Sequence, residues 1–153
     1  MALDELEPLI GHWSLAVSGG GFSDDMPSIE DQLASRAATA SFEWMDGREL
    51  LVQRWLTPDP GPDGLAVIGP DYEGDGYLQH YFDQRGVARV YKMTLKDGTW
   101  TLARETPDFS PLDFHQRFEG TFSDDGNRIE GAWEMKQDGD WAKDFDLVYA
   151  RFG

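Results

Sequence analysis

Residues 113–152 read DFHQRFEGTFSDDGNRIEGAWEMKQDGDWAKDFDLVYARF, and apolar side chains alternate with polar ones through most of this stretch. The alternation is interrupted at Asp125-Gly126 and again at Asp138-Gly139. A period of two is typical of a β-strand with one buried face, and Asp-Gly favours the tight turn that joins two strands of a hairpin. The stretch therefore predicts consecutive antiparallel strands at 113–123, 127–136 and 140–152.

The same pattern continues toward the N-terminus, where further Asp-Gly pairs begin at Asp46, Asp63, Asp75 and Asp97. The segments between and around these pairs predict strands at 10–17, 37–45, 48–57, 65–69, 76–82, 86–95 and 99–106. Strands joined by short turns form a meander, and closing a long meander removes its exposed edges. We therefore expect an all-β fold, a single up-and-down antiparallel β-barrel of about ten strands.

The predicted barrel is one domain that spans residues 1–153 and begins with a short acidic helix at about 3–9. A β-sandwich is the alternative, but it needs crossovers that short turns do not supply. Ser28 and Asp31 resemble a capping box, which predicts a short helix at 29–35 that could cover a barrel mouth. A disordered surface loop is the other interpretation of that segment.

The charge balance excludes several classes of partner. Acidic residues number 29 against 13 basic ones, a formal net charge of -16, so nucleic acid and anionic membranes are not expected as partners. The chain has no cysteine, and its three histidines lack the spacing of a zinc site, so no metal is expected. The N-terminus has no apolar signal segment, and a cytoplasmic location is expected. Exposed aromatic side chains would allow a homodimer.

Strand alternation also assigns side chains to the barrel interior, because one face of each strand points inward. Aromatic side chains mark the inner faces, and on residues 140–152 that face begins with Trp141 and Lys143. Residues 48–57 and 76–82 are apolar on both faces, so the direction of His80 stays open. The candidate ligand-binding residues are Arg89, Tyr91, Arg104, Gln116, Trp133, Tyr149, Arg151 and His80.

Three of these candidates are arginines, Arg89, Arg104 and Arg151, on otherwise apolar faces. A buried charge is costly unless it is paired, and a guanidinium group binds a carboxylate through two parallel hydrogen bonds. The arginines therefore favour a ligand that carries an acidic group. The alternative is that they lie near strand ends or pair with acidic side chains, and serve only the fold.

The segment Leu9-Ile10-Gly11-His12-Trp13 contains a Gly-x-Trp that resembles the calycin signature of lipocalins. The body of the chain is similar to bacterial lipocalin-like β-barrel domains of unknown function. The stretches that carry this similarity include 41–44, 81–87, 116–122 and 131–134. The resemblance implies a barrel fold, and it implies no established activity.

More distantly, the chain resembles fatty-acid-binding and nitrobindin-like barrels. Fatty-acid-binding barrels hold a carboxylate with Arg-x-Tyr on the last strand, whereas this chain has Tyr149-Ala150-Arg151 in the reverse order. Nitrobindin-like barrels hold haem through a histidine, and among His12, His80 and His115 only His80 could face inward. No cofactor is expected, and haem bound through His80 is the alternative.

The first functional hypothesis is that the lumen binds a small, largely apolar molecule that can be anionic. A second is an enzyme that templates an isomerisation or cyclisation, with Tyr91, Tyr149 or an arginine polarising the substrate. A third is a solid barrel, filled by its own aromatic side chains, whose outer surface contacts other proteins. The sequence leaves open whether any reaction is catalysed.

Overall fold

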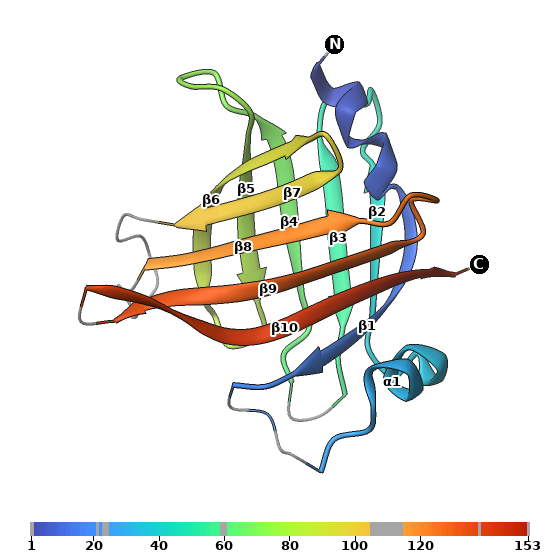
Figure 1. Cartoon of the computed structure of the whole chain (residues 1–153). Coiled ribbons are helices and arrows are strands. Elements are labelled where there is room, and N and C mark those ends of the chain that lie inside the picture. The colour runs from blue at the N-terminus through green and yellow to red at the C-terminus, as the bar shows by residue number, and fades with distance from the viewer. Residues whose placement is uncertain are drawn as a thin grey trace.

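The computed structural model describes residues 2–20, 22, 25–58, 61–104, 115–137 and 139–152. Ten antiparallel strands form a closed barrel, in which each strand pairs with its neighbours in sequence and β1 pairs with β10 (Figure 1). The strands are β1 (Gly11–Ser18), β2 (Thr39–Trp44), β3 (Leu51–Leu56), β4 (Gly64–Pro70), β5 (Tyr77–Asp83), β6 (Ala88–Lys96), β7 (Thr99–Arg104), β8 (His115–Phe122), β9 (Arg128–Gln137) and β10 (Asp140–Phe152). The predicted all-β, up-and-down barrel is confirmed. The predicted strand ends at 105–106 and 113–114 lie outside the described residues.

A 3-10 helix, η1 (Ala2–Leu9), lies across one end of the barrel, which we call the capped end (Figure 1). Its Leu6 and Leu9 are fully buried in the core. The indole Nε1 of Trp13 donates a hydrogen bond of 2.9 Å to the carbonyl oxygen of Leu9, which fixes the end of η1 to the start of β1. The other end, where β6 begins and β7 ends, is the far end.

A short helix, α1 (Ile29–Ser35), begins after Ser28, whose side chain accepts a hydrogen bond from the amide of Asp31. The predicted helix is thus present, but it does not cover a mouth of the barrel. Leu33 of α1 instead packs on the outer face of β1 and β10, against Ala16 and Val148. The apolar residue on α1 is buried there, in a small cluster outside the barrel interior. Neither helix of the described residues is long and apolar enough to cross a membrane.

The middle of the barrel and its capped end are filled by aromatic side chains from different strands. These residues are at most 5% exposed: Trp13, Phe42, Trp100, Phe118 and Tyr149. The ring centroids of Trp100 and Phe118 lie 5.1 Å apart, and those of Trp100 and Tyr149 lie 5.5 Å apart. A Cβ atom on Gly131 would lie 2.6 Å from the Phe118 ring, so the two are already in close contact. This half of the interior is a packed core.

A β-bulge in β10 corrects the predicted inner face of that strand. The register against β9 shifts between Lys143 and Phe145, so Asp144 is an extra residue there. An extra residue reverses the alternation of side chains. Trp141 and Lys143 therefore lie on the outer face, where the Trp141 ring lies 4.0 Å from the guanidinium carbon of Arg117. The prediction that Trp141 and Lys143 point inward was wrong.

Candidate functional site

Polar side chains gather on the inner wall near the far end of the barrel. Arg89 and Tyr91 come from β6, Arg104 from β7 and Gln116 from β8, and we call these four the polar wall. Arg104 and Gln116 are direct partners in the register of β7 and β8. All four are buried, with Arg89 and Gln116 each 8% exposed and Arg104 2% exposed. The alternation of their strands places them inward, as the sequence predicts.

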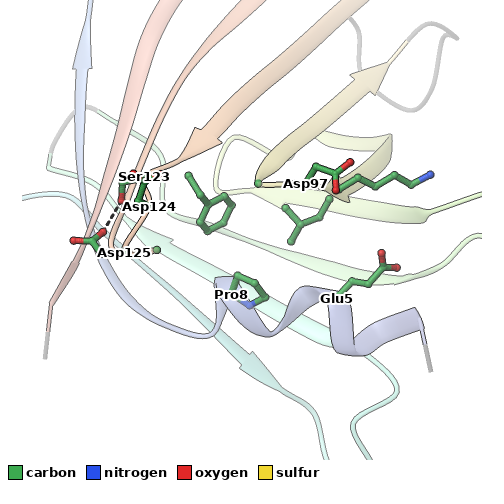
Figure 2. Close-up of a pocket in the computed structure, with 11 residues that line it drawn as sticks. Glu5, Pro8, Asp97, Ser123, Asp124 and Asp125 are labelled. Carbon is green, nitrogen blue, oxygen red and sulfur yellow. Dashed lines mark hydrogen bonds between the residues drawn. The ribbon is translucent and has the colours of Figure 1, made fainter.

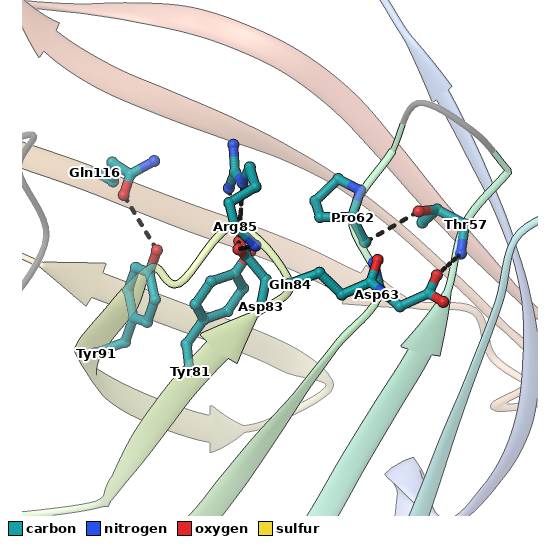
Figure 3. A network of polar contacts seen from close by, with 9 residues as sticks. All are labelled: Thr57, Pro62, Asp63, Tyr81, Asp83, Gln84, Arg85, Tyr91 and Gln116. Atoms are coloured by element: carbon teal, nitrogen blue, oxygen red, sulfur yellow. Dashed lines mark hydrogen bonds and ion pairs between the residues drawn. The ribbon is translucent and has the colours of Figure 1, made fainter.

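Hydrogen bonds join three members of the polar wall. The side-chain oxygen of Gln116 accepts one from the Tyr91 hydroxyl at 3.1 Å and one from Nε of Arg104 at 3.3 Å. Figure 3 shows the Tyr91 contact, with the amide nitrogen of Gln116 directed away from Tyr91. Because its oxygen serves two donors, the orientation of the Gln116 amide is fixed by its neighbours.

Arg89 differs from its neighbours in the polar wall. Within the described residues its Nε is completely buried and has no hydrogen-bond partner. Its guanidinium carbon lies 5.8 Å from the centre of the Tyr81 ring, which is its register partner on β5. A buried donor without an acceptor costs on the order of 1–3 kcal/mol. Such a group is a candidate for contact with a molecule that the chain itself does not contain.

Two inner glutamines extend the polar region and were not predicted as site residues. Nε2 of Gln79 on β5 donates a 3.0 Å hydrogen bond to the side-chain oxygen of Gln53 on β3, and both residues are buried. Their strands are apolar on both faces, so alternation alone did not orient them. A polar residue flanked by Val52 or Leu78 could face either way, and closure of the barrel decides the direction.

An aromatic surface runs beside the polar wall. The rings of Trp55 and Tyr81 stack at 5.0 Å with an interplanar angle of 25°. Tyr91 lies 6.1 Å from Tyr81 and 5.5 Å from Trp133 on β9. Trp55, Tyr81 and Trp133 are only half-buried, in contrast to the aromatic residues of the packed core. The inner wall is therefore more accessible at these residues than in the packed core.

A carboxylate at the far end is held by two neighbours (Figure 3). The Tyr81 hydroxyl and Nη2 of Arg85 each donate a 2.7 Å hydrogen bond to Oδ2 of Asp83. Burial acts to raise the pKa of Asp83, but the hydrogen bonds from Arg85 and Tyr81 outweigh it and hold that pKa at about 2. Burial, together with the bond to Asp83, raises the pKa of the Tyr81 hydroxyl. Asp83 thus remains ionised and already has its partners.

This arrangement predicts a specific loss of stability in acid. A carboxyl group with a lowered pKa stabilises the folded state above its ordinary pKa, and the contribution disappears as the pH falls toward the folded value. Between about pH 4 and pH 2 we expect the free energy of unfolding of the wild type to fall by about 1–2 kcal/mol more than that of Asp83→Asn. Urea unfolding at a series of pH values measures this. Asp46→Asn, at an exposed turn, should follow the wild type, and parallel curves for all three proteins would contradict the prediction.

The structure does not bring Arg151 to the polar wall. Arg151 lies at the capped end, where Nη2 donates hydrogen bonds to the carbonyl oxygens of Pro8 at 2.6 Å and Gly126 at 3.2 Å. Nη1 donates to the carbonyl oxygen of Ile10, and the guanidinium carbon lies 4.2 Å from the Trp13 ring. Its partners are backbone carbonyls of the chain, so the geometry gives Arg151 a structural role.

Tyr149, another predicted site residue, also lies apart from the polar wall. Tyr149 is buried among Trp13 and Trp100 in the packed half, and burial raises the pKa of its hydroxyl. Trp133, by contrast, is half-buried beside Tyr91, on the accessible part of the inner wall. Of the eight predicted residues, the five that the structure places together are Arg89, Tyr91, Arg104, Gln116 and Trp133.

His80 is exposed and lies on the outer face of β5, because Gln79 and Tyr81 take the inner positions. The sequence left the direction of His80 open, and the structure places this side chain outward. His12 is exposed as well, and His115 alternates with the inward-facing Gln116. Haem held by a lumenal histidine does not fit these residues. The described residues also contain no group of three or more His, Cys, Asp or Glu side chains that could hold a metal ion.

A groove of about 410 Å³ lies at the capped end. Figure 2 shows η1, with Glu5 and Pro8, on one side of the groove and the turn residues Asp97 and Asp125 on the other. The groove is lined by Glu5, Pro8, Leu95, Lys96, Asp97, Gly98, Phe122, Ser123, Asp124, Asp125 and Gly126. None of the predicted site residues is among them. The groove is a surface hollow between η1 and two hairpin turns.

The fold and its inner wall define a closed ten-stranded antiparallel barrel with polar groups and accessible aromatic rings toward one end. No protein-family model matches the chain, and no curated protein matches it. Among solved structures, the crystal structure of Rv2717c from M. tuberculosis is similar, with a TM-score of 0.61 and 15% sequence identity. The match covers 99% of this chain and 98% of that chain, so both have the same fold over their whole length.

Proposed function

We propose that this protein is a lipocalin-like barrel that binds a small, largely apolar molecule against its inner wall toward the far end. The observation that carries the proposal is the contrast within the barrel interior. Trp13, Phe42, Trp100, Phe118 and Tyr149 of the packed core are at most 5% exposed, whereas Trp55, Tyr81 and Trp133 are half-buried beside buried polar groups. Apolar surface with a few oriented polar groups is typical of small-molecule sites.

The lipocalin-like character is supported by the role of the Gly-x-Trp motif. Trp13 is fully buried at the capped end, and its indole nitrogen is bonded to the last residue of η1. The motif thus closes one end of the barrel and leaves the other for a ligand. We propose no catalysed step, because the Tyr91 hydroxyl is already donated to Gln116 and Tyr149 lies in the packed half.

A neutral fluorescent probe tests the proposal. N-phenyl-1-naphthylamine is weakly fluorescent in water and bright in apolar sites, so its titration measures apolar binding without help from charge. We expect saturable binding of one molecule per chain, with energy transfer from tryptophan. Native mass spectrometry of protein purified without added ligand provides a second readout, in which a small co-purifying mass supports the proposal.

Two tryptophans provide a matched pair of variants. Trp133→Gln alters the inner wall, while Trp141→Gln removes the same side chain from the outer face of the adjacent strand. Loss of about 1 kcal/mol or more of apolar contact should weaken probe binding at least about fivefold in Trp133→Gln, and Trp141→Gln should bind like the wild type. Thermal unfolding verifies that both variants are folded. The absence of saturable binding, or equal affinity in both variants, would refute the proposed function.

A further inference from the structure

We propose that the ligand is a planar aromatic monocarboxylate, whose carboxylate accepts a hydrogen bond from Nε of Arg89 and whose ring lies against the aromatic surface beside it. This inference rests on the proposed function, since it names the class of molecule that the same inner wall binds. It goes further in assigning a charge, a shape and one anchoring residue.

The charge follows from the surroundings of Arg89. The side chain belongs to a residue that is 8% exposed, and its Nε has no hydrogen-bond partner within the described part of the chain. The ion pairs formed among those residues do not include Arg89 either. A guanidinium group keeps its charge at all ordinary pH values. A buried cation is destabilising unless an anion pairs with it, and among the described residues no acidic side chain forms an ion pair with Arg89.

The neighbouring groups that the structure describes do not neutralise Arg89. Arg104, one strand away, shares the side-chain oxygen of Gln116 with Tyr91, and that amide is neutral. The acidic side chain on β5 at the same end is Asp83, whose oxygens accept hydrogen bonds from Arg85 and Tyr81. Among the described residues, the guanidinium group of Arg89 therefore faces a wall on which the acid is already engaged. An incoming carboxylate would supply the missing acceptor.

The shape follows from the rings next to Arg89. Tyr81 is the register partner of Arg89 and stacks on Trp55 with an angle of 25°, so the two rings present nearly parallel flat surfaces. Tyr91 and Trp133 continue the aromatic surface across β6 and β9. A planar ring can stack against these surfaces while an attached carboxylate reaches the guanidinium group. A long, bent alkyl chain would make less contact with these flat ring surfaces.

A single negative charge is favoured over a double one. The chain carries a formal net charge of -16, so every added unit of negative charge on a ligand is repelled by the surrounding field. A carboxylate brings one charge and matches the flat fork of a guanidinium group. A phosphate monoester brings close to two charges at pH 7 and is repelled more strongly.

The test compares three naphthalene compounds of the same ring size: 2-naphthoate, the neutral 2-naphthamide and the dianion 2-naphthyl phosphate. Isothermal titration calorimetry on the full chain gives the dissociation constant of each. For the wild type we expect 2-naphthoate to bind at least about tenfold more tightly than either of the others, the effect of one charge-assisted hydrogen bond.

Three variants assign that preference to Arg89. Arg89→Met should bind 2-naphthoate and 2-naphthamide equally, and Arg89→Lys should retain part of the preference because it keeps the charge. Arg54→Met is the matched control, since it removes one positive charge from an exposed outer position that pairs with Glu43. It should retain the full preference. Urea unfolding of each variant establishes that it is folded during the titration.

The outcomes separate this inference from the proposed function. Equal binding of 2-naphthoate and 2-naphthamide by the wild type, or an unchanged preference in Arg89→Met, would overturn the carboxylate assignment. If N-phenyl-1-naphthylamine still bound in that case, the apolar site would stand without the anion. Tighter binding of 2-naphthyl phosphate than of 2-naphthoate would overturn the choice of a monocarboxylate. Failure of the neutral probe and of all three naphthalene compounds would overturn both proposals.

Discussion

Replacing Arg151 with methionine is expected to lower the free energy of unfolding by about 2–4 kcal/mol. The guanidinium group donates to the carbonyl oxygens of Pro8, Ile10 and Gly126, and so connects the end of η1 to the β8–β9 turn. Methionine fills part of the same volume but leaves these carbonyl groups without their donor. It also removes the cation from the face of Trp13, at 4.2 Å.

Urea unfolding followed by tryptophan fluorescence measures this effect. Arg128→Met is the matched control, because Arg128 also lies at the capped end but pairs with Glu30 and Glu130 on the exposed surface. Exposed ion pairs contribute about 0–1 kcal/mol, so this variant should remain close to the wild type. Equal stability of Arg151→Met and Arg128→Met would show that η1 is held by its apolar residues alone.

Much of the fold could be predicted because its signals are local. Alternation over 127–136 and the turn at Asp125-Gly126 depend only on neighbouring residues, and each strand pairs with its neighbour in sequence. An open sheet leaves the backbone N–H and C=O groups of its two edge strands unpaired. A long meander is therefore expected to close into a barrel. For the same reason the inner direction of Arg89, Tyr91 and Arg104 could be predicted from alternation.

Other features could not be predicted because they depend on distant parts of the chain. The extra residue in β10, at Asp144, leaves no mark in the sequence pattern but reverses the direction of Trp141. His80 lies on a strand that is apolar on both faces, so only closure of the barrel decides its direction. The alternation of β10 predicts that Arg151 points into the lumen. Its hydrogen bond to Pro8 of η1 depends on a segment at the opposite end of the sequence, so it could not be predicted.

The direction of α1 illustrates the same limit. Ser28 and Asp31 are enough to predict a helix start, since the capping contact spans three residues. They say nothing about what the helix covers. Leu33 reaches Ala16 and Val148 only because β1 and β10 are paired, and these strands lie at opposite ends of the sequence. Local signals therefore predict elements, while the site depends on their closure into a ring.

Arg89→Met is expected to raise the free energy of unfolding of the ligand-free protein by about 1 kcal/mol. The variant replaces a buried donor that has no partner among the described residues with an apolar side chain of similar length, and so removes a cost that the folded state otherwise bears. A residue that destabilises the fold while facing a binding surface is expected where function, and not stability, requires it. The gain in stability should therefore accompany the loss of carboxylate binding.

Urea unfolding of protein that has been unfolded and refolded, to remove any bound molecule, measures this gain. Arg54→Met removes the same charge from the outer surface, together with its 2.7 Å ion pair to Glu43, and should lose about 0–1 kcal/mol. The two variants change net charge equally, so the difference between them isolates the environment of Arg89. A loss of more than about 1 kcal/mol in Arg89→Met would mean that the guanidinium group has a stabilising partner within the chain. The need for an external anion would then disappear.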